Sequence, residues 1–455
     1  MNQNGQRHLG INTAKTLNCK LRTENSKPKK MTPAQMLHID QNHVWHPFDL
    51  VSIAQNILIE KASGVYLYTP EGREILDAIG SWWVNIHGHS NPYIAEKVSH
   101  QLHKLEHVIF AGFTHEPAIQ LVKNLLTILP DNQQKVFFSD NGSTATEVAI
   151  KMAFQYWYNK GEDKTQIIAI DGAYHGDTFG AMSVGGRSKF NEPFAPYLFD
   201  VAFIDFPNGN NDTAVLDQFQ ILAESNKIAA FIYEPLIQGA AGMRMYAPKT
   251  LEKLLQIANK HNIICIADEV MTGFGRTGKL FASLHCITPP DIMCLSKGIT
   301  GGTMAMGVTT CTSKIYEAFV SEDIYKVFFH GHSYTGNPLA CTAANASFDL
   351  LMKEECTKNI ARISLANKAF CERILSKSWI QNVRTLGTVM AIEFKTDSAT
   401  SYFNNFRDQL YQYFLSKDIL LRPLGNIIYL IPPYIITNEE LERVYTAIEG
   451  MFEGE

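Results

Sequence analysis

The chain has 455 residues, of which 45% are hydrophobic, and a formal net charge of −5 at pH 7. This length and apolar content are enough for a large core and for two or more domains. Acidic and basic residues are interspersed, so we expect no nucleic-acid partner, and the apolar runs are too short to span a membrane, which takes roughly 18 residues. The eight cysteines are scattered and form no CxxC pair. They indicate free thiols in a reducing cytoplasm rather than disulfides or a zinc site.

The N-terminus differs in composition from the rest of the chain. Residues 1–30 are rich in Asn, Lys and Arg and carry one acidic residue, Glu24. They lack the apolar core of a secretory signal and the amphipathic spacing of a mitochondrial transit peptide. We predict a disordered extension over residues 1–43, or a start codon placed too early.

Globular patterning begins at Ile57. Apolar runs at 58–60 and 65–68, followed by the turn residues 70–73, predict a hairpin. Helical spacing predicts a helix over 118–129 that stops at Pro130. A short strand at 135–138 then leads into a polar segment and a helix over 146–157.

Strand-like runs next alternate with helical stretches, which predicts an α/β domain with a mostly parallel sheet covered on both faces. The strands are expected at 167–170, 201–204, 229–233, 263–267, 292–295 and 306–309, with helices that include 214–225 and 248–261. After Gly336 the pattern changes to long helices over 339–353 and 360–375 and strands at 390–394 and 427–431. We therefore predict a large domain over 91–338 and a smaller α+β domain formed by 44–90 and 339–455.

Two of these strands end in residues that suggest a pyridoxal phosphate site. The run 292–295 leads to Lys297, and the run 263–267 ends in Asp268 and Glu269. A lysine amine can form a Schiff base with the cofactor aldehyde, and an aspartate can keep the pyridinium nitrogen protonated, so that the ring acts as an electron sink. The alternatives are a solvent-exposed lysine and a helix-capping aspartate. Ligands of open α/β sheets bind beyond the carboxyl ends of the strands, which favours a site.

Two further segments suit such a cofactor. Gly142 and Ser143 lie between a strand and a helix, where backbone N–H groups and hydroxyls bind phosphate, although the same residues also cap ordinary helices. Tyr174 lies in a glycine-rich turn and could stack on a flat ring, although an aromatic residue there can simply be packing.

Two other motifs resemble binding sites for a dinucleotide and for a metal, but their surroundings do not fit either ligand. Residues 273–278 match GxGxxG, but Asp268 and Glu269 precede them and no helix signal follows, so we do not expect a dinucleotide. His330 and His332 alternate without a carboxylate or cysteine at ligand spacing, so we do not expect a metal. A loop that brings a hydroxyl to a phosphate is the better interpretation.

These residues together resemble the class III, fold-type I aminotransferases that use pyridoxal phosphate. The resemblance runs from about Val44 to the C-terminus, and its class-wide pieces are the Asp-Glu-Val at 268–270 and the Ser-Lys-Gly at 296–298. Within the class, the chain is similar to the branch that converts 8-amino-7-oxononanoate to 7,8-diaminononanoate in biotin biosynthesis. Specific pieces of the match include residues 45–47 and 174–182. The pieces that point to this branch are the double tryptophan within 81–89, the surroundings of His115 within 110–115, and the segment 422–429.

The resemblance implies roles for individual residues in a fold of a large pyridoxal phosphate-binding domain and a smaller α+β domain. It implies that Lys297 is the Schiff-base lysine and proton shuttle, that Asp268 pairs with the ring nitrogen, that Gly142 and Ser143 hold the phosphate, and that Tyr174 stacks on the ring. Arg422 would take the carboxylate of the keto substrate. The other substrate-pocket residues that it implies are Trp82, Tyr174, Lys297, Arg276, Tyr429, Phe48, Asp177 and Gly331. The loop of Gly331, His332 and Ser333 would reach the cofactor of a neighbouring subunit, which implies a homodimer with shared active sites.

Two departures from the usual pattern matter. The chain has Gly331, His332 and Ser333 where many members have Gly-Pro-Thr, and Ser333 keeps the hydroxyl. It has Phe48 where many have a tyrosine that meets the amino donor. We expect S-adenosylmethionine as the donor because Asp177 favours a cation, and lysine stays an alternative. Another class III ω-aminotransferase activity, or a pyridoxal phosphate-binding protein without turnover, are the rival interpretations.

Overall fold

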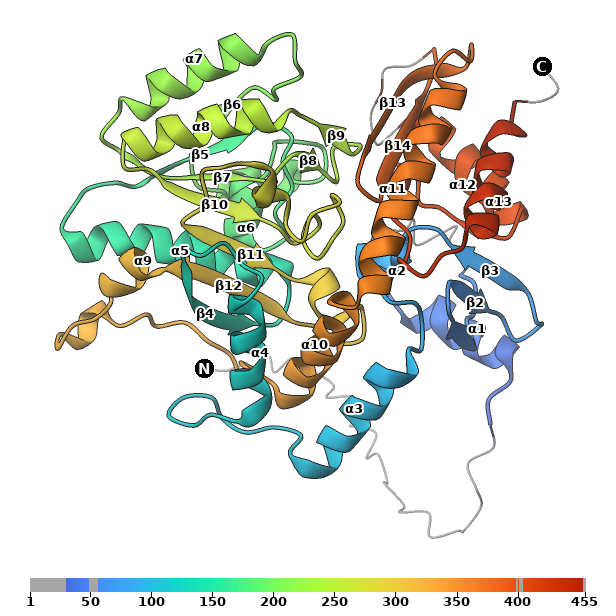
Figure 1. Ribbon diagram of the computed structural model, residues 1–455, viewed down its shortest axis with the longest axis horizontal. Coiled ribbons are helices and arrows are strands. Elements are labelled where there is room, and N and C mark those ends of the chain that lie inside the picture. The colour runs from blue at the N-terminus through green and yellow to red at the C-terminus, as the bar shows by residue number, and fades with distance from the viewer. Residues whose placement is uncertain (1–29, 49–55, 398–399, 401–403, 453–455) are drawn as a thin grey trace, which may run out of the picture. The chain divides into compact units, whose positions relative to one another are not determined.

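The computed structural model describes residues 30–48, 56–397, 400 and 404–452 (Figure 1). The chain divides into two compact units, Met1–Leu58 and Ile59–Glu455. In the first unit, helix α1 (Pro33–His43) begins at Thr32, whose side chain and that of Gln35 cap each other's backbone N–H groups. α1 lies within the segment predicted as an extension, and residues 1–29 of that segment lie outside the described residues.

A seven-stranded sheet organises the second unit, with strand order β4-β12-β11-β10-β7-β5-β6. β12 runs antiparallel to β11 and β4, and the other neighbouring pairs are parallel. The prediction of a mostly parallel sheet is therefore confirmed. The strands are β4 (Gln133–Ser139), β5 (Gln166–Ile170), β6 (Val201–Ile204), β7 (Ile228–Tyr233), β10 (Ile264–Asp268), β11 (Ile292–Leu295) and β12 (Gly307–Thr312).

Helices cover both faces of this sheet (Figure 1). Every residue of β7 is buried, and its alternate side chains enter two different cores. Phe231 and Tyr233 pack in the core shared with α8 (Pro248–Lys260), whereas Ala230 and Ile232 pack in the core shared with α5 (Gly142–Lys160). α7 (Asp212–Ala223) packs beside α8 on the same face.

α5 begins one turn earlier than the predicted helix over 146–157. Asn141 is its N-cap and forms a capping box with Thr144, and Gly161 ends it in a left-handed conformation with φ +72°. Its first turn consists of small residues that carry no apolar periodicity, so spacing alone could not locate this start.

A three-stranded antiparallel sheet, β13-β14-β16, lies in the C-terminal part with α11, α12 and α13 (Figure 1). A second sheet, of order β1-β2-β3-β15, joins distant parts of the chain because β15 pairs in parallel with β3. The predicted hairpin belongs to this sheet, but its first strand is β1, and of residues 58–60 only Glu60 bonds to Tyr68. The elements are β1 (Lys61–Ser63), β2 (Tyr66–Tyr68), β3 (Glu74–Asp77), β13 (Ile380–Leu386), β14 (Val389–Phe394), β15 (Ile419–Leu420), β16 (Ile427–Leu430), α11 (Glu354–Ile374), α12 (Phe406–Ser416) and α13 (Asn438–Glu449).

The remaining elements connect these parts. They are α2 (Gly80–Trp83), α3 (Pro92–Lys104), α4 (Glu116–Leu126), α6 (Phe179–Val184), α9 (Ser313–Glu317), α10 (Pro338–Leu351), β8 (Ile237–Gln238), β9 (Arg244–Met245) and the 3₁₀ turns η1 (Glu192–Tyr197), η2 (Ala282–His285), η3 (Lys297–Thr300) and η4 (Ile324–Lys326). Within the described ranges, no helix combines the length and the apolar character that crossing a bilayer requires.

Candidate active site

Lys297 and Asp268 lie at the carboxyl ends of neighbouring parallel strands, as the sequence predicts. Asp268 is the last residue of β10 and is paired in register with Cys294 of β11. Lys297 follows β11 with its backbone in the left-handed region, at φ 43°. Its Nζ lies 4.9 Å from the centroid of the Trp83 ring. Desolvation by this environment lowers the pKa of Lys297, which favours the neutral amine that a carbonyl-directed nucleophile needs.

His175 holds the carboxylate of Asp268. His175 Nδ1 lies 2.7 Å from Asp268 Oδ2, and the backbone N–H of Val270 donates to Oδ1 at 3.0 Å. Both side chains are buried, and His175 Nε2 has no hydrogen-bond partner among the described residues. His175 is not among the residues predicted from the sequence, although it stands next to Tyr174 in the same turn.

The start of α5 faces the turn that carries Tyr174. Ser143 Oγ accepts the backbone N–H of Asp177 at 3.0 Å. A Cβ on Gly176 would lie 1.9 Å from Ser143 Oγ, and a Cβ on Gly142 would lie 2.8 Å from Val270 Cγ1. Both positions therefore require glycine, and the close approach leaves the helix N-terminus lined by backbone.

A buried glutamate fixes Tyr174. Glu234 follows β7, and its carboxylate accepts the backbone N–H groups of Tyr174 and Gly239, each at 2.9 Å. Burial raises the pKa of Glu234 to about 7. The Tyr174 hydroxyl donates to Asp177 Oδ2 at 2.9 Å, and burial, followed by the charge of Asp177, raises the pKa of Tyr174. Glu234 is also not among the residues predicted from the sequence, although it follows an apolar strand much as Asp268 ends one.

The two tryptophans join Lys297 to residues of the C-terminal part. The Trp83 ring meets the Tyr429 ring edge-on, with centroids 5.8 Å apart. The Arg422 guanidinium carbon lies 4.7 Å from the centroid of the Trp82 ring. Arg422 Nη2 is buried and has no hydrogen-bond partner in the described part of the chain. A planar cation with an unused donor is suited to receive a carboxylate.

The segment 273–278 folds as turns rather than as the start of a helix. Arg276 is 1% exposed, and its guanidinium donates to the backbone carbonyls of Pro432, Trp83 and Asn85 at 2.6, 3.3 and 3.2 Å. These donors support the wall of the site. The predicted contact of Arg276 with substrate stays a prediction.

Three of the predicted residues lie in one loop of the second unit, and a fourth lies in the first unit. Gly331, His332 and Ser333 lie in a loop before α10 whose described bonds are local, such as the one from the His332 N–H to Thr335 Oγ1 at 3.0 Å. Phe48 belongs to the first unit and has a backbone φ of 60°. Their predicted roles concern a neighbouring subunit and the amino donor.

The arrangement can hold pyridoxal phosphate. It offers a nucleophilic amine, a buried carboxylate, an aromatic ring and a helix N-terminus, which suit the aldehyde, the ring nitrogen, the ring face and the phosphate of that cofactor. Among the described residues, no group of three or more His, Cys, Asp or Glu side chains could hold a metal ion.

Comparisons with known proteins show the family to which the chain belongs. The family model of the class III aminotransferases matches residues 51–452, and the chain belongs to that family. It is 44% identical over 421 residues to an adenosylmethionine-8-amino-7-oxononanoate aminotransferase of Synechococcus elongatus, covering 90% of this chain and 98% of that protein. A protein of the same name from Staphylococcus aureus is 38% identical, with coverage of 90% and 95%.

Solved structures show the same likeness. The crystal structure of the adenosylmethionine-8-amino-7-oxononanoate aminotransferase of Methanocaldococcus jannaschii has a TM-score of 0.86 at 35% identity, covering 91% of this chain and 98% of that one. An amine transaminase from an uncultivated Pseudomonas species, in its PLP-bound internal aldimine form, has a TM-score of 0.85 at 29% identity, with coverage of 90% and 98%. The predicted family and the predicted fold class are confirmed, and the chain is an aminotransferase.

Proposed function

We propose that this aminotransferase converts 8-amino-7-oxononanoate to 7,8-diaminononanoate, a step of biotin biosynthesis, with S-adenosylmethionine as the amino donor. The relatives at 44% and 38% identity carry the name of that reaction. The observation that carries the proposal is Arg422, whose buried Nη2 lacks a partner among the described residues and whose guanidinium lies on Trp82. The guanidinium of Arg422 can bind the terminal carboxylate of a long keto acid, which is the amino acceptor of this reaction.

Pyridoxal phosphate is the cofactor, and when bound it supplies the electron sink and carries the amino group from donor to acceptor. Lys297 binds it through Nζ and moves a proton to or from the substrate carbon, a task that its lowered pKa supports. Asp268, oriented by His175, holds the proton on the ring nitrogen. Gly142 and Ser143 at the start of α5 hold the phosphate.

The aromatic residues, together with the opposite charges of Arg422 and Asp177, orient the substrates. Tyr174, tied to Glu234 through its backbone N–H, stacks on the cofactor ring. Trp82 and Tyr429 line the acceptor side with Arg422. Asp177, which holds the Tyr174 hydroxyl, attracts the positive charge of the donor. Arg276 supports the pocket and completes the predicted set around the substrate.

We also infer a homodimer with shared active sites, in which Gly331, His332 and Ser333 of one subunit reach the cofactor of the other. Ser333 is exposed, as a residue that serves a neighbouring subunit would be in a single chain. The boundaries of the large domain at 91–338 and of the smaller domain remain part of this proposal. A reducing cytoplasm is supported by the free cysteines of the described ranges, which are buried apart from the half-buried Cys286.

The donor is the least constrained part of the proposal. Phe48 has no hydroxyl, so a donor with ribose and purine groups loses a hydrogen bond worth about 1 kcal/mol. Lysine also carries a second cation for Asp177 and is the alternative donor.

A two-step assay with the purified holoenzyme tests the proposal. S-adenosylmethionine or lysine is added alone, the cofactor absorbance is followed, excess donor is removed, and 8-amino-7-oxononanoate is then added. We expect the donor to change the cofactor spectrum, the keto acid to restore it, and 7,8-diaminononanoate to be detected by mass spectrometry. A spectrum that 8-amino-7-oxononanoate does not restore, while other keto acids or aldehydes do, would instead support a different class III ω-aminotransferase.

A further inference from the structure

The turn that carries Trp82 and Trp83 has an unfavourable backbone. Gly80, Ser81 and Trp83 have φ values of 59°, 61° and 67°, and Ser81 combines its φ with a ψ of −91°. The turn also closes tightly, because the N–H groups of Val84 and Asn85 both donate to the carbonyl of Gly80 at 3.0 Å. Conformations of this kind persist only where the surroundings over-determine them, and they cluster at functional sites.

Asp77, the last residue of β3, binds the first half of this turn. It is fully buried, and its Oδ1 accepts the N–H of Ile79 at 3.2 Å. Its Oδ2 accepts the N–H and the hydroxyl of Ser81 at 2.6 and 3.1 Å and lies 2.8 Å from His89 Nε2. His89 Nδ1 lies in turn 3.2 Å from Asn85 Nδ2, at the end of the turn. One buried carboxylate therefore gathers donors from both sides of the strained residues.

A buried cation binds the second half. The guanidinium of Arg276 donates to the carbonyls of Trp83 and Asn85. Burial lowers the pKa of Arg276, and the charges of Tyr434 and Asp77 oppose that shift. The turn thus lies between an anion that collects its N–H groups and a cation that collects its carbonyls. Since each bond involves a charged partner, each is stronger than a neutral hydrogen bond.

The two rings held by this turn meet the two basic side chains of the site. The Trp83 ring lies 4.9 Å from Lys297 Nζ, and the Trp82 ring lies 4.7 Å from the Arg422 guanidinium carbon. A rotation of the turn would displace both rings together, because the two residues are adjacent in the chain.

We propose that Asp77, acting through His89 and the turn Gly80–Trp83, is a positioning residue that holds Trp82 against Arg422 and so sets the affinity for the keto-acid substrate. The inference rests on the proposed function, because the ligand of Arg422 is the acceptor of the proposed reaction. Asp77 itself contacts the turn and His89, and its effect on the substrate is indirect.

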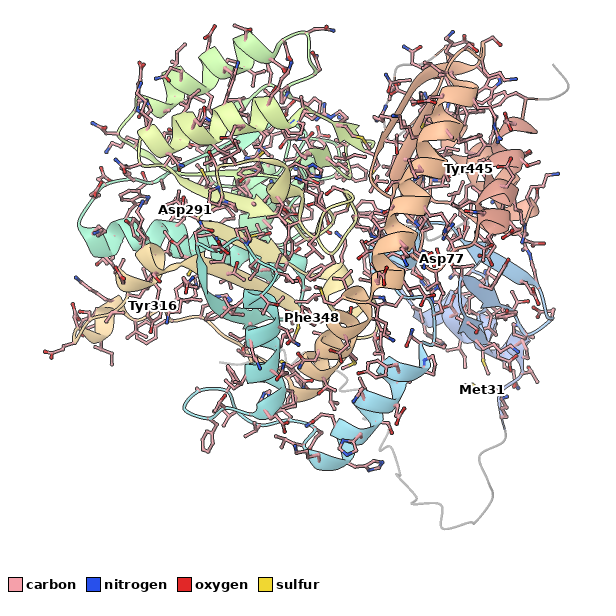
Figure 2. The ribbon with its side chains drawn as sticks, viewed as in Figure 1. Met31, Asp77, Asp291, Tyr316, Phe348 and Tyr445 are labelled. Atoms are coloured by element: carbon pink, nitrogen blue, oxygen red, sulfur yellow. The ribbon has the colours of Figure 1, made fainter. Side chains whose placement is uncertain are left out.

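The test compares two carboxylates by the same substitution. Asp77→Asn removes the charge that collects the donors of the turn. Asp291→Asn is the matched control, because Asp291 accepts the backbone N–H of Cys265 at 2.9 Å at the amino end of β11, away from the active-site edge of the sheet. Figure 2 labels both residues and shows them in different parts of the molecule.

We expect Asp77→Asn to raise KM for 8-amino-7-oxononanoate by about tenfold, the loss of a charge-assisted hydrogen bond, with a smaller change in kcat. The donor half-reaction should change by less than about twofold. The near-ultraviolet circular dichroism of the apoenzyme should also change, because tryptophans move. Asp291→Asn should lower the thermal midpoint without either effect. Equal KM values in both variants would overturn the inference.

A double-mutant cycle tests the path of the effect. If Asp77 acts through Trp82, then Asp77→Asn should change KM by less than about twofold in a Trp82→Ala background, whereas independent roles would make the effects add.

Should Asp77→Asn fail to fold, two substitutions of His89 provide a milder test. His89→Leu should raise KM and His89→Gln, which keeps a donor for Asp77, should restore it, and equal KM values in that pair would contradict the inference.

Failure of the proposed function gives a different result. A wild-type enzyme that does not aminate 8-amino-7-oxononanoate would contradict the proposed reaction. The same KM comparison with the acceptor that it does use, together with the apoenzyme spectrum, would then decide the role of Asp77.

Discussion

Removing the guanidinium of Arg422 should separate the two halves of the reaction. Arg422 lies against Trp82 with one buried donor that lacks a partner among the described residues. A bidentate, charge-assisted contact with a carboxylate contributes about 2–3 kcal/mol at such a partly exposed position. Arg422→Ala should therefore lower kcat/KM for 8-amino-7-oxononanoate by roughly 30- to 150-fold. Arg422→Lys keeps the charge but not the planar fork, so we expect a loss of about tenfold.

The measurement is single-turnover absorbance of the cofactor in each half-reaction separately. The rate of the donor half-reaction should stay within about twofold of wild type in both variants. The reason is that the positive charge of the donor is expected to lie near Asp177 rather than near Arg422. A neutral acceptor analogue that lacks the terminal carboxylate should bind wild type and Arg422→Ala equally. Equal losses in both half-reactions, or a loss that persists with the neutral analogue, would show that Arg422 supports the fold of the pocket instead.

Four further predictions test the rest of the site. Lys297→Ala should abolish covalent attachment of the cofactor and nearly all turnover, and a borohydride-reducible bond at another lysine in this variant would refute the assignment. Asp268→Asn should still bind the cofactor but lose orders of magnitude in the proton-transfer step, so near-wild-type single-turnover rates would exclude its role. Burial raises the pKa of Glu234 to about 7, so the folded state binds the carboxyl proton more tightly than the unfolded state does. The free energy of unfolding should therefore fall as the pH rises from about 4.5 to 7. Apoenzyme denaturation should show that Glu234→Gln removes up to about 3 kcal/mol of this pH dependence, and parallel stability curves for both proteins would contradict it. Phe48→Tyr should raise kcat/KM for S-adenosylmethionine by about fivefold and leave lysine unchanged, and a wild type that uses lysine alone with no response to the substitution would overturn the donor choice.

Fold class and the two central residues could be predicted from the sequence because their signals are local. Strands of a covered parallel sheet are continuous apolar runs, and the run at 292–295 coincides with β11 as the structure has it. Lys297 and Asp268 follow directly from such strands, and the carboxyl edge of an α/β sheet is where ligands bind. The resemblance to the class III aminotransferases rested on motifs of the same local kind.

Hydrogen-bond partners that lie far apart in the sequence could be identified only from the tertiary structure. Asp268 meets His175 across 93 positions of the chain, and Arg276 reaches the carbonyl of Trp83 across 193. No periodicity relates such residues, because a hydrogen bond depends on where two elements come to lie and not on the spacing within either of them. The antiparallel direction of β12 was equally hidden, since a buried strand reads as the same apolar run in both directions.

The strained turn at Trp82 and Trp83 also has some features that follow from the sequence and others that only the tertiary structure decided. The sequence by itself determined that two adjacent tryptophans come a few residues after Asp77, and the resemblance implied that one of them lines the substrate pocket. Only the tertiary structure decided that Asp77 lies fully buried among the donors of that turn and that Arg276 collects its carbonyls. The physical reason is that a positive φ costs energy at residues other than glycine, so Ser81 and Trp83 keep this conformation only where the folded surroundings compensate for it.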